Sequence, residues 1–329
     1  MIDQVRLMRP IVHCITNYVT AGDVANMVLA AGASPIMADG VKEMEDIAAI
    51  SHGLVLNLGT LKETAIEAMV IAGKRTAALG HPVVLDPVGA AASSFRRETA
   101  LKILKEVPCS VIRGNASEIR ALAGAILGRE GNISSRGVDT DQKAAMNEQN
   151  RETTASMAQC LSRAVNAVVV MTGETDLVAD AERVCLVKNG HPMMGRITGS
   201  GCMLDGVIGA FLAAEAAGAE QVFRQADCAA AEAAGAKQVF RQTDCAAAEA
   251  AGAGQVFRQT DCAAAEAAGA ELIFRQTVYA VAAEGICGEL AYEKTMRSGG
   301  GTATFRMHFI DAMSLLTDED IRRMSKIEV

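Results

Sequence analysis

From the first residues to Lys188, short apolar runs alternate with amphipathic stretches, which predicts strands separated by helices. Runs such as LVL and VVVM are apolar throughout, as is typical of strands buried on both faces of a parallel sheet. Strands are expected at Pro10–Asn17, Ser34–Met37, Gly53–Thr60, Pro82–Gly89, Ser110–Arg113 and Ala167–Thr172. Helices are expected at Asp23–Ala31, Glu43–Ser51, Lys62–Leu79, Thr99–Val107 and Ala116–Leu127. This order predicts an α/β fold with a mostly parallel central sheet covered on both faces.

The remaining pattern adds an antiparallel pair and a helical end. Leu177–Ala179 and Arg183–Lys188 are expected to pair through a turn, and nearly everything after Gly201 is expected to be helical. Gly128–Ser156 is polar and predicts a surface loop with a solvated helix from about Gln142. We therefore expect one domain over residues 1–329.

Polar or small residues collect where the expected strands end. In parallel sheets, ligands bind beyond the carboxyl ends of the strands, although loops also begin with polar residues for no functional reason. The residues in this position are Asn17, Met37, Gly59, Thr60, Asp86, Arg113 and Thr172. Their coincidence predicts a binding site at one edge of the sheet.

Residues 213–270 contain tandem repeats of 17 residues, with the approximate unit AAEAAGAxQVFRQTDCA. Each unit is rich in helix formers and carries one glycine, Gly218, Gly235, Gly252 or Gly269, where a helix break is expected. Either one unit is bent or broken, or a longer helix bridges one glycine while another segment loops. We interpret the insertion as a helical protrusion away from the active site, with an interaction module as the alternative.

Composition excludes several classes of partner. The net charge of the 329-residue chain is −8 and its pI is about 5.3, which argues against nucleic acid and anionic membranes. No leader sequence or uncharged run long enough to span a bilayer is recognised. Nine scattered cysteines without a Cys-x-x-Cys pair indicate reduced thiols and a cytoplasmic protein.

The stretch TGSGCMLDG, residues 198–206, precedes an apolar run that predicts a helix. Glycines at 199 and 201 allow backbone N–H groups to face one pocket, and the helix start adds its positive dipole end. Such a bend can stabilise the charge of a phosphoryl group in transfer, although a tight helix start alone would explain the same pattern. Cys202 follows the second glycine.

Three further strand ends carry groups suited to phosphate and metal. Arg113 could pair with phosphate oxygens, and the hydroxyl of Thr172 could reach a phosphate or base. Glu118 lies in the first turn of an expected helix, where it could either cap the helix or hold a metal through water. Asp86 and Glu118 together could hold Mg²⁺, which bridges nucleotide phosphates.

In this order, the motifs resemble the hydroxyethylthiazole kinase family, a branch of the ribokinase-like superfamily. The resemblance covers nearly the whole chain except the repeats and part of 141–156. The matching stretches are HCITNYV (13–19), GASPIM (32–37), NLGT (57–60), LDPVG (85–89), IRGNASEI (112–119), RGVDT (136–140), VVVMTGETD (168–176), TGSGCML (198–204) and FRMHFIDAMSLL (305–316).

The resemblance implies a ribokinase-like three-layer sandwich that uses ATP and Mg²⁺ to phosphorylate 4-methyl-5-(2-hydroxyethyl)thiazole. It implies that Met37 and Gly199 contact the thiazole alcohol, that Asn17 shapes its pocket, and that Arg113 and Thr172 contact ATP, beside the amide of Gly201. It also implies a homotrimer with sites at subunit boundaries.

Cys202 distinguishes this family, because most ribokinase-like kinases carry an aspartate there as general base. A thiol at a helix N-terminus is expected to have a lowered pKa, so partial thiolate character is expected. A loose phosphoryl transfer needs little deprotonation of the alcohol, so Cys202 is expected to position the hydroxyl and give weak base assistance. The alternatives are another ribokinase-like alcohol kinase, and a degenerate kinase that serves as a helical-repeat scaffold.

Overall fold

The computed structural model describes residues 1–128, 150–233 and 259–329, with side chains between 219 and 268 excepted. The chain divides into two compact units, one made of Met1–Ala217 and Ile273–Val329, the other of Gly218–Leu272. The first unit contains the sheet and every predicted site residue. The predicted RGVDT motif and the start of the Gln142 helix lie outside the described residues.

The sheet of the first unit has the strand order β2-β1-β3-β4-β5-β6-β7-β8-β9 among the described residues. Its strands are β1 (Ile11–Ile15), β2 (Ser34–Ile36), β3 (Gly53–Asn57), β4 (Val83–Asp86), β5 (Val111–Asn115), β6 (Val168–Thr172), β7 (Asp176–Ala179), β8 (Val184–Val187) and β9 (Ile327–Glu328). The first six are parallel, and β7, β8 and β9 pair antiparallel. The expected mostly parallel sheet is confirmed.

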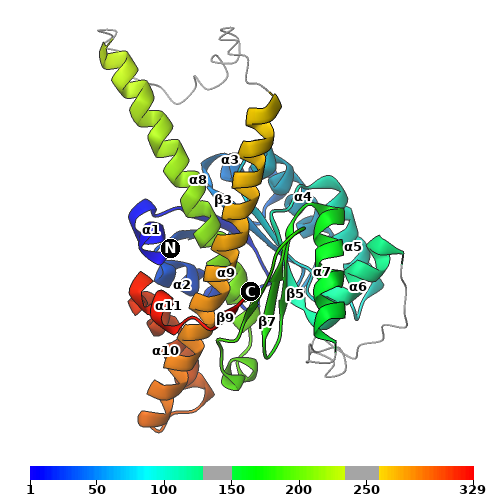
Figure 1. Ribbon diagram of the computed structural model, residues 1–329, viewed down its shortest axis with the longest axis vertical. Helices are drawn as coiled ribbons and strands as arrows, with labels where there is room; N and C mark the ends of the chain where they lie inside the picture. Colours follow the sequence, from blue (N-terminus) through cyan, green and yellow to red (C-terminus); the bar gives the residue numbers. More distant parts are fainter. Residues whose placement is uncertain (129–149, 234–258) are drawn as a thin grey trace. The chain divides into compact units, whose positions relative to one another are not determined.

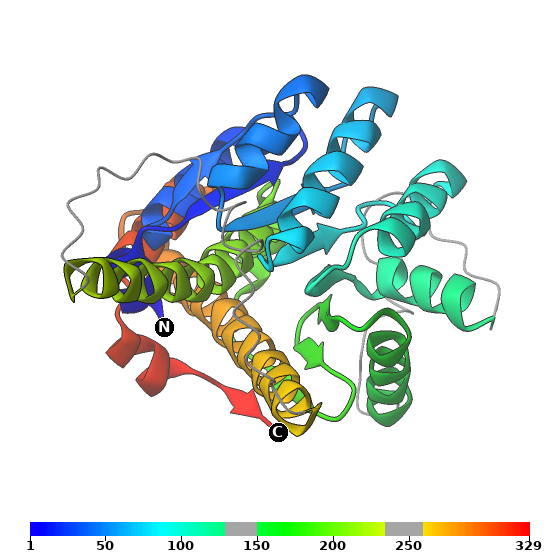
Figure 2. The ribbon, with the colours of Figure 1, turned by 90° about the horizontal axis from the view of Figure 1, so that it is seen from above.

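Two hydrophobic cores lie on opposite faces of this sheet, because successive strand residues point to opposite sides. Val55 belongs to one core, and its neighbours Leu54 and Leu56 belong to the other. The first core is formed with α1 (Ile2–Met8), α2 (Ala21–Ala31), α8 (Ser200–Ala233), α9 (Gln259–Arg297), α10 (Thr302–Leu315) and α11 (Asp318–Met324). The second is formed with α3 (Met44–Ile50), α4 (Glu63–Ala78), α5 (Ser94–Glu106), α6 (Ala116–Leu127) and α7 (Arg151–Val165). Figures 1 and 2 show these helices around the sheet, which is the middle layer of three.

The observed elements differ from the sequence expectations mainly at their ends. Most of the parallel strands are shorter than expected, so that β1 ends at Ile15 and Asn17 follows it in a loop. Arg113 lies inside β5, which continues to Asn115, instead of ending the strand. Short 3-10 turns at Val41–Glu43 (η1) and Pro192–Arg196 (η2) join the longer elements. The short helix α1 and the edge strand β9 were not expected as separate elements.

The strand order changes direction at β1. The chain passes from β1 through α2 to β2 on one side, and then crosses to β3 on the other side of β1. Loops that leave the carboxyl ends of β1 and β3 therefore separate here. In open α/β sheets such a switch point is where ligands bind.

The long helix α8 passes through Gly218, and α9 passes through Gly269. The expected breaks at these two glycines are therefore wrong, because one glycine costs a helix only about 1 kcal/mol and its neighbours here are strong helix formers. The expected breaks at Gly235 and Gly252 lie outside the described residues.

The first part of α8 has the length and hydropathy of a membrane-crossing helix. This stretch, Ser200–Gly218, carries two acidic residues, and 72% of its most apolar window is buried inside the protein. Phe211 and Ile208 on this stretch belong to the core that covers one face of the sheet. The stretch is thus packed as the core helix of an α/β domain.

Candidate active site

Polar side chains from four strands and one helix meet at the carboxyl edge of the sheet. Asn17 follows β1, Asn57 ends β3, Asp86 ends β4, and Arg113 lies in β5. Cys202 stands in the first turn of α8. The structure thus brings together residues that are up to 185 positions apart, as the strand-end pattern predicted.

The thiol of Cys202 accepts two amide hydrogen bonds. Asn17 Nδ2 lies 3.3 Å and Asn57 Nδ2 lies 3.4 Å from Cys202 Sγ. Asn17 Nδ2 also donates to Asn57 Oδ1 at 3.1 Å, and Asn57 Nδ2 donates to Asp86 Oδ2 at 2.7 Å. These amides fix the position of the thiol beside the carboxylate of Asp86.

The guanidinium of Arg113 joins three elements. Its Nη1 lies 3.1 Å from Asp86 Oδ2, and its Nη2 donates to Thr172 Oγ1 at 3.2 Å. The backbone of Gly201 packs directly against Nη1 and Nη2, so that a Cβ at position 201 would overlap them. Glycine at 201 is therefore required by this close approach.

Gly199 turns the chain into α8. Its φ of 84° lies in the left-handed region, and an added Cβ would meet Thr20 Cγ2 at 2.5 Å. The carbonyl of Gly199 accepts from Met203 N at 2.8 Å, which begins the helix. Because the N–H groups of a first helical turn lack partners within the helix, this start can bind an anion.

Glu118 caps a helix, which is one of the two roles expected for it. Its Oε2 accepts from Asn115 N at 2.8 Å while Asn115 Oδ1 accepts from Glu118 N, a complete capping box. Its Oε1 accepts from Gly89 N at 2.7 Å, which ties the loop after β4 to α6. Burial and the charge of Asp86 raise the pKa of Glu118 to about 7.

The expected lowering of the Cys202 pKa is wrong. Burial, together with the carboxylates of Asp86 and Asp205, raises the pKa of this thiol to about 11. A charge within a few ångströms in a buried site outweighs the partial charge of a helix end. Cys202 is therefore a neutral thiol at physiological pH.

Asp205 is a functional candidate that the sequence reading missed. It lies one turn after Cys202 on α8, is fully buried, and its Oδ1 is 3.9 Å from Arg113 Nη1. Burial raises the pKa of Asp205 to about 6, and burial and Asp205 raise that of Asp86. The signal was one acidic residue inside the apolar run MLDGVIGAF, one turn from the cysteine.

Asn57 was also missed, although it begins the NLGT motif and is the last residue of β3. Its side chain bonds Cys202, Asp86 and Asp205, which makes it the most connected amide of the site. Met37, which follows β2 and packs against the first core, makes none of the contacts given for this cluster of described residues.

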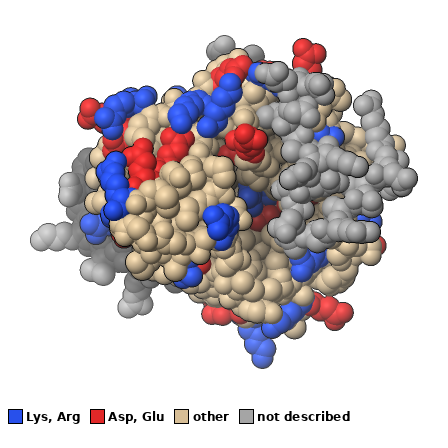
Figure 3. All heavy atoms as spheres, turned by 90° about the horizontal axis from the view of Figure 1, so that it is seen from below, with Lys and Arg blue, Asp and Glu red and all other residues tan. Residues whose placement is uncertain are grey.

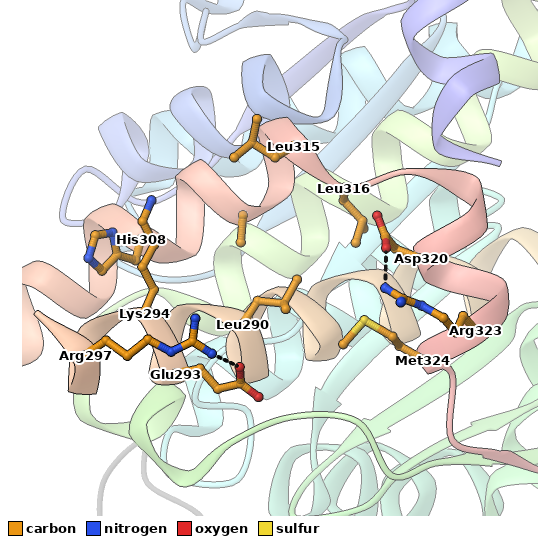
Figure 4. Close-up of a pocket in the computed structure, with 11 residues that line it drawn as sticks. Leu290, Glu293, Lys294, Arg297, His308, Leu315, Leu316, Asp320, Arg323 and Met324 are labelled. Carbon is orange, nitrogen blue, oxygen red and sulfur yellow. Dashed lines mark hydrogen bonds and ion pairs between the residues drawn. The ribbon is translucent and has the colours of Figure 1, made fainter.

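A hollow of about 340 Å³ lies between α9, α10 and α11 (Figure 4) and contains none of the predicted site residues. Its rim carries Arg297 and Arg323, each of which pairs with an acidic side chain of its own helix. Because these charges are already balanced, we place the candidate active site at the sheet edge and not in this hollow.

Comparison with known proteins identifies the family. The model of the hydroxyethylthiazole kinase family matches residues 2–252. The chain belongs to this family. It is 36% identical over 327 residues to a hydroxyethylthiazole kinase of Clostridium botulinum, covering 99% of this chain and 94% of the relative. A hydroxyethylthiazole kinase of Desulfovibrio desulfuricans is 50% identical over 212 residues, covering 64% of this chain and 72% of the relative.

The fold agrees with this family assignment. The solved hydroxyethylthiazole kinase of Pyrococcus horikoshii aligns with a TM-score of 0.71 at 29% identity, covering 99% of this chain and 96% of that one. A ribokinase-like protein of Enterococcus faecalis aligns with a TM-score of 0.50 at 10% identity, covering 96% and 94%, and shares the fold alone. The ribokinase-like α/β fold expected from the motifs is thus confirmed.

Proposed function

We propose that this protein transfers the terminal phosphoryl group of ATP to the hydroxyl of 4-methyl-5-(2-hydroxyethyl)thiazole, giving the thiazole phosphate used in thiamine biosynthesis. Membership of the hydroxyethylthiazole kinase family supports the reaction. The single structural observation that carries it is the contact of Arg113 with Gly201 at the start of α8, beside Cys202. A phosphate bound there would contact the N-terminus of α8 and the guanidinium of Arg113, and it would lie next to Cys202, where the alcohol hydroxyl is expected.

The residues divide the work by position. Arg113, Thr172 and the amide of Gly201 bind the nucleotide phosphates, because they form one polar surface at the ends of β5, β6 and the start of α8. Met37, Gly199 and Asn17 form the alcohol side: Asn17 and Met37 follow β1 and β2, and Gly199 forms the turn into α8. Cys202, neutral and held by two amides, places the hydroxyl for in-line attack and does not need to remove its proton early.

Mg²⁺ fits this site through Asp86. The Oδ1 atom of Asp86 is buried and has no hydrogen-bond partner among the described residues, and carboxylate oxygens are the ligands that Mg²⁺ prefers. Glu118 would act on the metal through water or through its hydrogen bonds, because both of its oxygens already accept backbone N–H groups. When bound, Mg²⁺ neutralises charge on the phosphates.

The direct test is turnover of the purified protein with ATP, MgCl₂ and the thiazole alcohol, followed by detection of the thiazole phosphate and ADP. We expect equal formation of both products and loss of turnover when EDTA removes the metal. A pyrimidine alcohol that turned over faster would point to another ribokinase-like kinase. Nucleotide binding without turnover of any small alcohol would point to a degenerate kinase that serves as a scaffold.

We also expect a homotrimer in the cytoplasm, with the alcohol site completed by a second subunit. Tyr18 and Val19 directly follow Asn17 and are 72% and 56% exposed, which supports contact between subunits at this loop.

The charges on the face in Figure 3 are of both signs and interspersed, as on an ordinary protein surface.

Light scattering should give about three times the 34.3-kDa chain mass. A Val19→Glu variant should form smaller species and lose turnover, because a charge would be buried between subunits. The matched control is Leu79→Glu, which alters an exposed leucine between α4 and the start of β4, at the amino-terminal ends of the parallel strands. It should remain a trimer, and a monomeric wild-type protein with full activity would contradict the boundary-site proposal.

A further inference from the structure

Two buried carboxylates, and not one, face the guanidinium of Arg113. Asp86 and Asp205 are each 0% exposed and lie 3.1 and 3.9 Å from the same Nη1 atom. Asp86 approaches from the sheet at the end of β4, whereas Asp205 approaches from the helix α8. Burying a second carboxylate against one cation is costly, so a purely structural position would be better filled by a neutral side chain.

The arrangement of Arg113 shows what the second carboxylate achieves. Nη1 donates to Asp86 Oδ2 and lies within ion-pair distance of Asp205 Oδ1, while Nη2 faces Thr172 and the backbone of Gly201, where the phosphate site is expected. Asn57 Nδ2 donates to Asp205 Oδ2 at 3.3 Å and to Asp86 Oδ2 at 2.7 Å, so it links the two carboxyl groups, which also interact with each other. The orientation of the guanidinium thus depends on the sheet and on α8 together.

We infer that Asp205 is a positioning residue that holds the Arg113 guanidinium from the α8 side, so that Nη2 faces the nucleotide phosphate. This inference rests on the proposed function, since it assigns the nucleotide to Arg113. In this role Asp205 acts on the nucleotide through Arg113 and not by direct contact. Removing the charge of Asp205 should therefore weaken nucleotide binding only while Arg113 is present.

A double-mutant cycle tests this dependence by calorimetric binding of AMP-PCP with MgCl₂. The proteins are wild type, Asp205→Asn, Arg113→Gln and the double variant. Asp205→Asn should weaken binding about tenfold in the wild-type background and less than about twofold in the Arg113→Gln background, as expected for coupled residues. Equal losses in both backgrounds would show an independent structural role and overturn the inference.

The matched control is Asp180→Asn. Asp180 is a buried carboxylate that pairs with Arg183 at the opposite edge of the sheet, and this variant should bind AMP-PCP like wild type. If Asp205→Asn does not fold, the same cycle is run with Asp205→Ser, which keeps a polar partner for Asn57. Because the cycle measures nucleotide binding alone, failure of the thiazole alcohol to react would refute the proposed acceptor without affecting the result for Asp205.

Discussion

At the scale of single residues, Cys202 is a neutral hydrogen-bond acceptor and not a thiolate. Two asparagine amides donate to its sulfur, and burial, together with two nearby carboxylates, raises its pKa to about 11. A thiol that keeps its own proton cannot accept the proton of the alcohol before the phosphoryl group is transferred. The rate must then come from the surrounding charges, which is consistent with a loose transition state.

The Cys202→Asp variant tests this view. We expect it to match or exceed wild-type turnover, because a carboxylate can also accept the hydroxyl proton. Its activity should rise with pH, since two neighbouring carboxylates raise the pKa of a third. The control Cys202→Ser should lose less than about tenfold, whereas loss of a true general base costs about 10²–10⁴. Near-total inactivity of Cys202→Asp would show that the pocket has another role for the thiol.

The second residue-scale prediction concerns Glu118, whose pKa rises from 4.5 unfolded to about 7 folded. The native state then binds the extra proton, so stability is present below pH 4.5 and is lost as the pH rises to about 7. Glu118→Gln removes this dependence. In metal-free buffer, urea unfolding should favour the variant by about 1–3 kcal/mol more at pH 8 than at pH 4.5. A pH-independent difference between the two proteins would contradict the assignment.

Some residues of the site could be predicted from the sequence and others could not, and the difference has a physical reason. Asp86, Thr172 and Cys202 were predictable because each stands at a strand end or a helix start that the apolar pattern marks. Asn57 and Asp205 were not singled out, because their role depends on which side chains meet across the sheet. The raised pKa of Cys202 was missed for the same reason, since Asp205 contributes to it.

At the scale of elements, α8 depends on close packing against α2 and the sheet. Its residues Gly206 and Gly209 lie one turn apart, and an added Cβ would be 2.8 Å from Val28 Cγ2 and from Val55 Cγ2, respectively. These contacts set the distance between the helix start and the strand ends. The pattern of the sequence located α8 but not this proximity, because an apolar run does not show which small residues touch a partner.

Gly209→Ala should therefore lower the stability of the fold by about 1–3 kcal/mol through overpacking, although alanine is the better helix former. The control is Gly269→Ala in α9, where an added Cβ meets nothing within 4 Å. That variant should be neutral or more stable by up to about 1 kcal/mol. The measurement is the thermal unfolding midpoint, and a stabilised Gly209→Ala protein would argue against tight packing of α8.

At the scale of the whole molecule, the site and the repeats belong to different compact units. All predicted site residues lie in Met1–Ala217, whereas the repeats fill most of Gly218–Leu272. The sequence predicted the insertion from its 17-residue period and gave a helix that bridges one glycine only as an alternative, whereas helices continue through both Gly218 and Gly269. The glycines alone did not predict this continuation, because the alanine-rich segments on both sides favour helix and a single glycine breaks a helix only weakly.

Deleting residues 220–270 should leave turnover within about twofold of the full-length protein, because long insertions outside a core cost little and contribute little. The deletion removes three repeat units and keeps every residue of the Cys202 cluster. Turnover and trimer mass are measured together, with deletion of one unit, residues 237–253, as the control. A collapse of activity in the longer deletion would show that the repeats take part in catalysis or assembly.

The hydrogen bond between Asn17 and Cys202 joins positions 185 residues apart in the chain. During synthesis, the loop that carries Asn17 has no partner at position 202 until the ribosome has released α8. Fragments that stop before residue 200 also lack α9 to α11, which with α8 supply much of the core on one face of the sheet. The Cys202 cluster cannot be complete in such fragments, and we expect them to bind no nucleotide.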